Sequence, residues 1–170
     1  MLDKAFKFLD QLTQLFNVAG TLLIVGLMVL IGSDVLGRQA FNTPISGVPE
    51  MVSLSIVAIV FLQVPQALRS GRFTRSDALL NYFWQSRPRL AKVMEVFFDM
   101  IAIGILFALL YAAWPLFIID WERNTFVGAV GDFTAPVWPV KLVIVIGTVM
   151  LILQFVSRIV RAVTEPETTL

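Results

Sequence analysis

The chain has 170 residues, of which 58% are hydrophobic and 15% are charged, and its formal net charge is +1. Soluble domains carry roughly 25% charged and about 45–50% apolar residues, so this composition indicates an integral membrane protein. Cysteine and histidine are both absent, which excludes a disulfide framework, a Cys/His zinc site, histidine-ligated haem and a Ser-His-Asp triad. We expect no catalytic residue, no metal site, no cofactor and no nucleic-acid partner.

The first segment, residues 1–14, has the pattern of an amphipathic helix that lies on the membrane surface. Its apolar residues recur at helical spacing, opposite a polar face that includes Lys7 and Gln11. The segment lacks the basic run, short apolar core and small-residue cleavage site of a signal peptide, so we expect it to remain in the protein. The apolar stripe comprises Leu2, Phe6, Leu9, Leu12 and Phe16.

Four apolar stretches follow, each long enough to cross a membrane. A bilayer core about 30 Å thick requires roughly 20 apolar residues in helical form. The connection 76–90 carries aromatic residues ahead of two arginines, which predicts a second interfacial helix with Ser76 or Asp77 near its cap. We therefore expect the chain 1–170 to be one all-α integral membrane domain with interfacial helices and four transmembrane helices, at about 15–33, 48–68, 93–119 and 139–156.

The distribution of basic residues predicts the orientation of these spans. Short cytoplasmic loops of membrane proteins carry an excess of Lys and Arg. If the N-terminus lies in the cytoplasm, ten of the 13 basic residues lie inside, and only Arg38, Arg123 and Lys141 lie outside. We therefore expect four spans with both termini cytoplasmic.

The outer hairpin between the first two spans holds three of the few charged residues, Asp34, Arg38 and Glu50. Asp34 and Arg38 are four residues apart, a spacing that favours an ion pair on one helix face. Glu50 opens the second span and is expected to reach Arg38 across a turn stiffened by Pro44. We expect a clamp that locks the two spans and can dock a partner. A catalytic carboxylate pair is disfavoured, because nothing else in the hairpin could bind or activate a substrate.

The second outer loop, between residues 120 and 139, is acidic and is expected to be irregular. Its tryptophans can belong to the aromatic belt at the membrane interface, and its charged residues can dock a soluble partner. Both interpretations stay open for the candidate docking residues, which are Asp120, Glu122, Arg123, Asp132 and Trp138.

The third span carries two further features. Asp99 should be partly buried at its cytoplasmic end, and Arg158 or Arg161 at the same depth on the fourth span is its expected partner. We expect an intramembrane clasp between Asp99 and Arg158 rather than a proton or cation site, because one carboxylate without a relay is a poor ion path. A stripe of small residues lets another helix approach closely, and either internal packing or a partner subunit explains it. The stripe consists of Gly104, Ala108 and Ala112.

Three stretches together resemble the small membrane subunit (DctQ-type small permease) of tripartite ATP-independent periplasmic (TRAP) transporters. The first is DVLGRQAFNTPISGVPE, where Arg38, Phe41, Pro44 and Glu50 fit the family pattern. The second is LRSGRFTRSDALL, in which Gly71 and Asp77 match a cytoplasmic-loop motif, although many members carry a histidine where Phe73 stands. The third is APVWPVKLVIVIG, which is similar to the entry into the family's last span.

The resemblance implies a scaffold role in the bacterial inner membrane. Such subunits pair with a large sodium-coupled subunit that moves as an elevator, and a periplasmic substrate-binding protein delivers an organic acid, a carboxylate or a sulfonate. We expect the large subunit to be a separate chain, and membrane lipid to contact the remaining surface. The uncharged centres of the spans agree with this role, because they offer no path for an anionic substrate.

Two alternatives remain beside the scaffold. A self-contained four-span exporter working as a dimer would need a carboxylate deep in the first span, and that region is uncharged. An anchor subunit of another membrane complex is compatible with the composition. An enzyme is not expected, because the chain has no histidine, cysteine or central carboxylate cluster.

Overall fold

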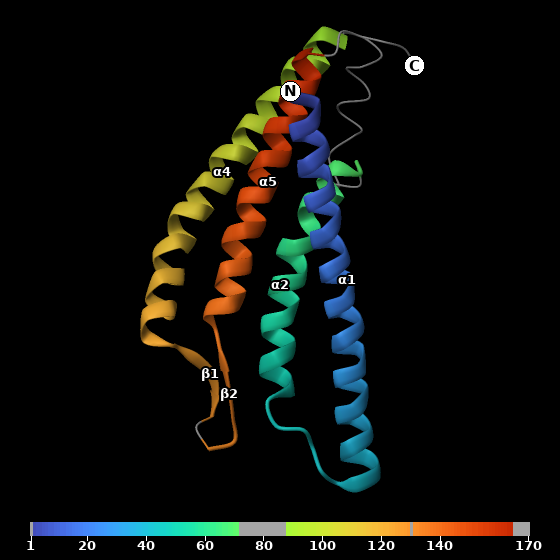
Figure 1. Cartoon of the computed structure of the whole chain (residues 1–170), viewed down its shortest axis with the longest axis vertical. Helices are drawn as coiled ribbons and strands as arrows, with labels where there is room; N and C mark the ends of the chain where they lie inside the picture. Colours follow the sequence, from blue (N-terminus) through green and yellow to red (C-terminus); the bar gives the residue numbers. More distant parts are fainter. Residues whose placement is uncertain (1, 72–87, 130, 165–170) are drawn as a thin grey trace.

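A computed structural model describes residues 2–71, 88–129 and 131–164 of the chain (Figure 1). It contains the helices α1 (Leu2–Phe41), α2 (Val48–Arg69), α4 (Pro88–Arg123) and α5 (Trp138–Thr164), and a short antiparallel ribbon of β1 (Phe126–Ala129) and β2 (Phe133–Pro136). Within the described residues, these four helices are long and apolar enough to cross a membrane. The prediction of an all-α four-span membrane protein is thereby confirmed.

The N-terminal segment is continuous with the first span. Residues 2–14 belong to α1, which runs without a break to Phe41, so the structure has one helix where the sequence suggested two. No proline occurs in α1, and the polar residues near its start do not interrupt helical hydrogen bonding. The placement of residues 1–14 at the membrane surface stays a prediction. The predicted helix over 76–90, with its cap at Ser76 or Asp77, lies outside the described residues up to position 87.

Glycine and proline set the ends of α2. Gly47 precedes the helix with φ of 81°, and a proline occupies the first turn, where a missing N–H costs nothing. At the other end, Gly71 takes φ of 67° and its N–H bonds to the carbonyl of Leu68, a left-handed termination that glycine adopts without strain. Gly71, predicted as a family-motif residue, therefore ends the second span.

The second outer loop is not irregular, contrary to the prediction. Phe126 pairs with Pro136 and Ala129 pairs with Phe133 in the β1–β2 ribbon. Gly128 makes this pairing possible, because an added Cβ would lie 2.1 Å from the carbonyl oxygen of Phe133. Strands of four residues are too short to show a clear alternating pattern in the sequence.

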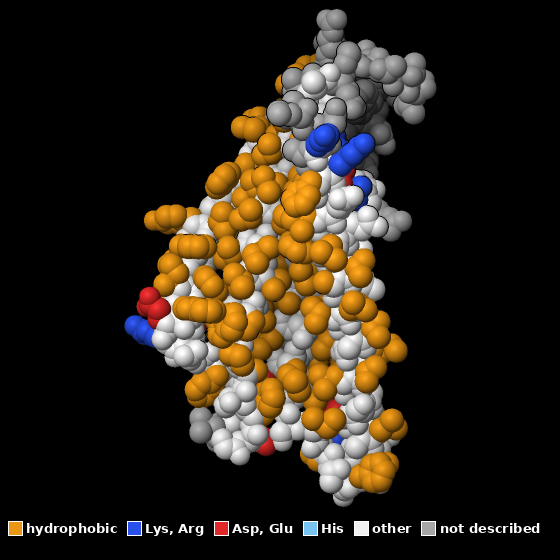
Figure 2. Space-filling model, viewed as in Figure 1, with side chains coloured by type: hydrophobic (Ala, Val, Ile, Leu, Met, Phe, Trp, Pro, Cys, Tyr) orange, Lys and Arg blue, Asp and Glu red, His pale blue; other side chains and the backbone are white. Residues whose placement is uncertain are grey.

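The helices lie side by side in the order α4, α5, α2, α1 (Figure 1). Helix α5 is the most enclosed: 50% of its most apolar window is buried, against 0% in α4. The core joins Leu68 of α2 to Leu151 and Phe155 of α5, with Ile103 and Leu106 of α4 against them. Elsewhere, large apolar side chains are exposed over the middle of the molecule (Figure 2), as expected for a surface in contact with lipid.

Helices α2 and α5 approach each other closely at Gly147. An added Cβ there would lie 2.5 Å from the carbonyl oxygen of Phe61. Pro65, inside α2, has no N–H to donate to this carbonyl four residues earlier. One Cα hydrogen of Gly147 takes the place of Cβ and points at the carbonyl, a weak but favourable contact. At this crossing, a glycine of α5 therefore covers a carbonyl of α2 that Pro65 leaves without its helical hydrogen-bond donor.

This crossing gives a stability prediction. Gly147→Ala must push α5 away from the α2 backbone, and overpacking of this kind costs about 1–3 kcal/mol. We expect a lower unfolding midpoint of the detergent-solubilised protein, followed by circular dichroism. Gly26→Ala is the matched control, because nothing lies within 4 Å of its added Cβ and alanine is the better helix former by about 1 kcal/mol. Equal midpoints for the two variants would contradict the close crossing.

Candidate functional site

The charged residues that the structure describes gather at the two ends of the helices. We call the end that carries the α1–α2 connection and the β1–β2 ribbon the loop end, and the opposite end the terminus end (Figure 1). Between these ends, each helix has a stretch without any Asp, Glu, Lys or Arg: residues 11–33, 51–68, 100–119 and 142–157.

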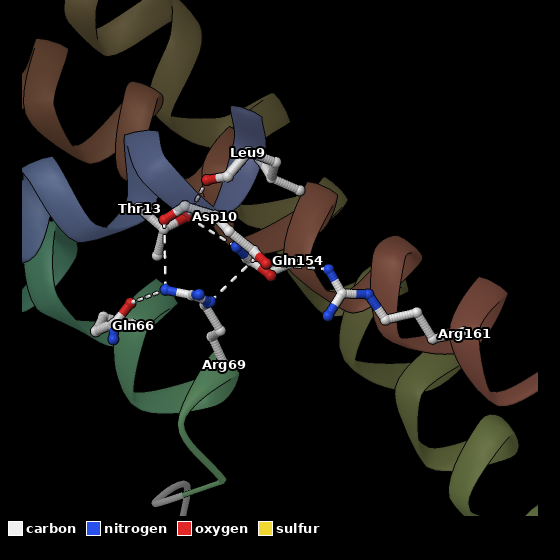
Figure 3. Close-up of polar contacts among 7 residues, drawn as sticks. All are labelled: Leu9, Asp10, Thr13, Gln66, Arg69, Gln154 and Arg161. Atoms are coloured by element: carbon white, nitrogen blue, oxygen red, sulfur yellow. Dashed lines mark hydrogen bonds and ion pairs between the residues drawn. The ribbon is translucent and has the colours of Figure 1, made fainter. Parts of the chain in front are cut away.

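At the terminus end, Asp10 joins three helices (Figure 3). Its carboxylate lies 3.2 Å from Nε of Arg69 on α2 and accepts a 3.1 Å hydrogen bond from Nη2 of Arg161 on α5. The Asp10 side chain is 17% exposed, so its charge is largely shielded from water. Arg161 also lies over the ring of Phe6, at 5.1 Å from its centroid. One carboxylate thus holds α1, α2 and α5 together.

A buried hydrogen bond reinforces this junction one turn further into the membrane. The side-chain amide of Gln154 donates to the hydroxyl oxygen of Thr13 at 2.7 Å, and that hydroxyl donates to the carbonyl of Leu9 at 2.8 Å (Figure 3). Thr13 is fully buried and Gln154 is 5% exposed. A buried polar side chain without a partner is costly in a membrane, so this pair fixes the register of α1 against α5.

Asp99 and Arg158 lie together at the same end, as the sequence suggested. Arg158 Nη2 donates to the Asp99 carboxylate at 2.5 Å and lies 3.3 Å from Glu95. Asp99 is 2% exposed, so the ion pair is shielded and joins α4 to α5. The other predicted partner, Arg161, is bound to Asp10 instead.

Asp34 organises the connection between α1 and α2 at the loop end. One carboxylate oxygen accepts a 2.9 Å hydrogen bond from Nε of Arg38, and the other accepts one of the same length from the backbone N–H of Ile45. The expected contact between Glu50 and Arg38 is wrong: no ion pair involves Glu50 within the described part of the chain. The loop folds back on Asp34 rather than towards Arg38, and Glu50 remains in the first turn of α2, where the helix dipole favours an acid. Pro44 lies exposed in the loop.

The two connections of the loop end touch each other. Ser46 donates a 2.6 Å hydrogen bond from its hydroxyl to the carboxylate of Asp132. The Phe133 ring of β2 lies so close to Gly47 that an added Cβ would be 2.0 Å from it. We call the surface formed by residues 42–47 and the β1–β2 ribbon the loop-end platform. Residues 42–47 connect α1 to α2 and the ribbon connects α4 to α5, so the platform links the two halves of the row of helices.

The predicted docking residues divide into two groups. Asp120 is 7% exposed and paired with Lys141, so it ties the end of α4 to the start of α5 and is not available to a partner. Trp138 packs edge-on against Trp121, with ring centroids 4.7 Å apart. The exposed residues are Glu122, Arg123 and Asp132.

The small-residue stripe faces outwards. Gly104, Ala108 and Ala112 are all exposed, and nothing lies within 4 Å of a Cβ added at Gly104. Internal packing against the described helices therefore does not explain it. The family-motif residue Asp77 lies outside the described residues.

Asp10, Thr13 and Gln154 were not among the residues predicted to form a site. The signal for Gln154 was its place inside an apolar span, where an amide needs a partner. Asp10 was harder to recognise as a contact residue from the sequence. A helix on the membrane surface over residues 1–14 would leave it in water, like the other polar residues of that segment. The role of Asp10 depends on the tertiary approach of α2 and α5.

These contacts define a four-span helical membrane protein whose ionic contacts hold the helices at both ends and leave the centre apolar. The family model of the tripartite ATP-independent periplasmic transporters, DctQ component, matches residues 27–165. The chain belongs to this family, the small membrane component of such transporters. No curated protein and no solved structure matches the chain.

The Asp10 junction gives a second stability prediction. Asp10→Asn removes the charge that binds two arginines whose side chains are 32% and 41% exposed, so we expect a loss of about 1–2 kcal/mol. The unfolding midpoint in detergent should fall by about 2–8 °C. Gln11→Ala, on the exposed side of the same helix turn, should leave it unchanged. Equal unfolding midpoints for Asp10→Asn and the control would show that the Asp10 junction does not contribute to the stability of the protein.

Proposed function

We propose that this chain is the scaffold subunit of a TRAP-type secondary transporter in the bacterial inner membrane. It pairs with a large, separately encoded, elevator-type subunit that carries the sodium and substrate sites. It also helps to dock a periplasmic binding protein that delivers an organic acid, a carboxylate or a sulfonate. The observation that carries the proposal is the separation of ionic contacts from an uncharged centre.

The uncharged centre supports a scaffold rather than a conducting subunit. Transport of an anion requires polar or charged groups near the membrane midplane, and the stretches 11–33, 51–68, 100–119 and 142–157 have no ionisable acid or base of the Asp, Glu, Lys or Arg type. The paired charges at Asp10, Asp99 and Asp120 instead tie neighbouring helices to one another. A rigid row of helices suits a subunit against which another part moves.

The loop-end platform supports a docking role on the periplasmic side. The contacts of Ser46 with Asp132 and of Phe133 with Gly47 join both outer connections into one surface. Glu122 and Arg123 are exposed beside it and are free to meet charged groups of a soluble protein. With the loop end in the periplasm, both termini lie in the cytoplasm.

Purification from the native host in mild detergent tests the assignment. We expect a large integral membrane protein to co-purify in a stoichiometric amount. Proteoliposomes with this chain alone should show no sodium-dependent uptake, whereas those with both membrane subunits and the binding protein should. Recovery of a homodimer that transports unaided would refute the scaffold assignment.

The absence of cysteine makes the orientation directly measurable. Glu122→Cys should react with a membrane-impermeant maleimide in intact spheroplasts. Lys7→Cys, which is also exposed, should react only after the membrane is permeabilised. The reverse pattern would invert the proposed topology.

The platform gives a prediction for docking. Gly47→Ala introduces a Cβ into the Phe133 ring and should weaken coupling to the binding protein, seen as reduced uptake at low binding-protein concentration. Gly131→Ala is the matched control, since Gly131 also has a positive φ (100°, against 81° at Gly47) but has nothing within 4 Å of the added Cβ. Equal uptake by the two variants, with equal amounts of complex, would exclude the platform from docking.

A further inference from the structure

Helix α4 packs against the rest of the described chain on one side only. Ala102, Ile103 and Leu106 face the core, whereas the opposite side is open. Tyr111 on that side is 86% exposed, and Pro115, one turn further on, is exposed as well. The free side of α4 forms one outer edge of the row of helices.

Pro115 makes this edge different from an ordinary lipid-facing surface. Because proline has no N–H, the carbonyl of Tyr111 lacks the donor that residue i+4 normally supplies in a helix. Lipid tails cannot donate a hydrogen bond, and a backbone carbonyl without a donor is costly in the hydrocarbon region. Prolines are tolerated in spanning helices where a neighbouring helix satisfies the freed group.

A second carbonyl freed by a proline lies in α2, and there a neighbouring helix of the same chain covers it. In α2, Pro65 frees the carbonyl of Phe61, and the backbone of Gly147 on α5 lies directly against it. A small residue on the adjacent helix makes that approach possible. On α4 the freed carbonyl is present, and no described helix covers that side.

The surroundings of Tyr111 and Pro115 leave room for a helix. Ala108 and Ala112 add almost no bulk beside the freed carbonyl and are exposed. An open groove of about 620 Å³ adjoins it between α4 and α5, with Phe107 and Trp114 in its walls, and this volume can receive large side chains from a partner.

The opposite edge of the row also has open small residues, at Gly26 and Gly32, but it has no carbonyl freed by a proline. The free side of α1 carries bulky exposed side chains, among them Leu22, Met28 and Val29, and α1 has no proline. Lipid tails alone can cover such a surface, because no proline there leaves a backbone carbonyl without its helical donor.

We propose that the outer edge of α4 around Tyr111 and Pro115 binds a transmembrane helix of the large membrane subunit, and that this helix donates a hydrogen bond to the Tyr111 carbonyl. The inference rests on the proposed function for the identity of the partner. It assigns the edge of this chain at which the two membrane subunits meet, and leaves the α1 edge to lipid.

Site-specific photocrosslinking in native-host membranes tests this. Benzoylphenylalanine at Tyr111 should give an adduct with the large subunit, whereas the same probe at Met28, which is 71% exposed, should give none. A purified complex with the adduct at Met28, or with only lipid adducts at Tyr111, would overturn the assignment of the edge and leave the scaffold function intact. Failure to purify any complex would overturn both.

A second variant separates the hydrogen bond from mere contact. Pro115→Ala restores the helical N–H and should make α4 itself more stable, yet it removes the carbonyl's need for an external donor. We expect the recovery of the large subunit to fall by about threefold or more while the unfolding midpoint of the isolated chain rises. Unchanged or increased recovery would show that the freed carbonyl does not hold the partner.

Discussion

The bilayer interior supplies no water to a polar group, and this constraint governs the whole arrangement. A spanning helix satisfies its own backbone, but every charge and every interrupted hydrogen bond needs a partner from the protein. The chain meets the requirement in two ways. Its charges are confined to the helix ends, and the shielded ones at Asp10 and Asp99 are paired across helices. Its proline-freed carbonyl in α2 is covered by a glycine of α5.

This distribution separates two tasks along the membrane normal. The terminus end fixes which helices are neighbours, because Asp10 contacts α2 and α5 and Asp99 contacts α5. The loop end fixes the surface offered to other molecules, because Asp34 shapes one connection and Asp132 binds it to the other. Between the two ends, the apolar side chains pack against neighbouring helices and against lipid. In this member of the TRAP small-subunit family, helix packing and surface presentation are therefore served by opposite ends of the same four helices.

Sequence reasoning recovered the elements of the fold more fully than the contacts between them. Four spans follow from hydropathy, and the pairing of Asp99 with Arg158 follows from their matching depth. The Asp34–Arg38 pair follows from helical spacing. The role of Asp10 could not be predicted, because it depends on which faces of α2 and α5 approach α1. Likewise, Glu50 was expected to reach Arg38, but the loop geometry set by Ile45 and Gly47 directs the chain elsewhere. The β1–β2 ribbon gave no clear pattern, because its strands have only four residues each.

The spacing of the ionic contacts along α1 has a consequence for the membrane itself. Asp10 and Asp34 are 24 residues apart, which is about 36 Å of helix at about 1.5 Å per residue. Asp99 and Asp120 on α4 are 21 residues apart, or about 32 Å. Both lengths are close to the hydrophobic thickness of a bilayer, about 30 Å. The paired charges therefore define upper and lower boundaries for the surrounding lipid, and a bilayer much thicker than this span would draw ion pairs into hydrocarbon. A bilayer of about this thickness keeps the paired charges of both helices at its two surfaces.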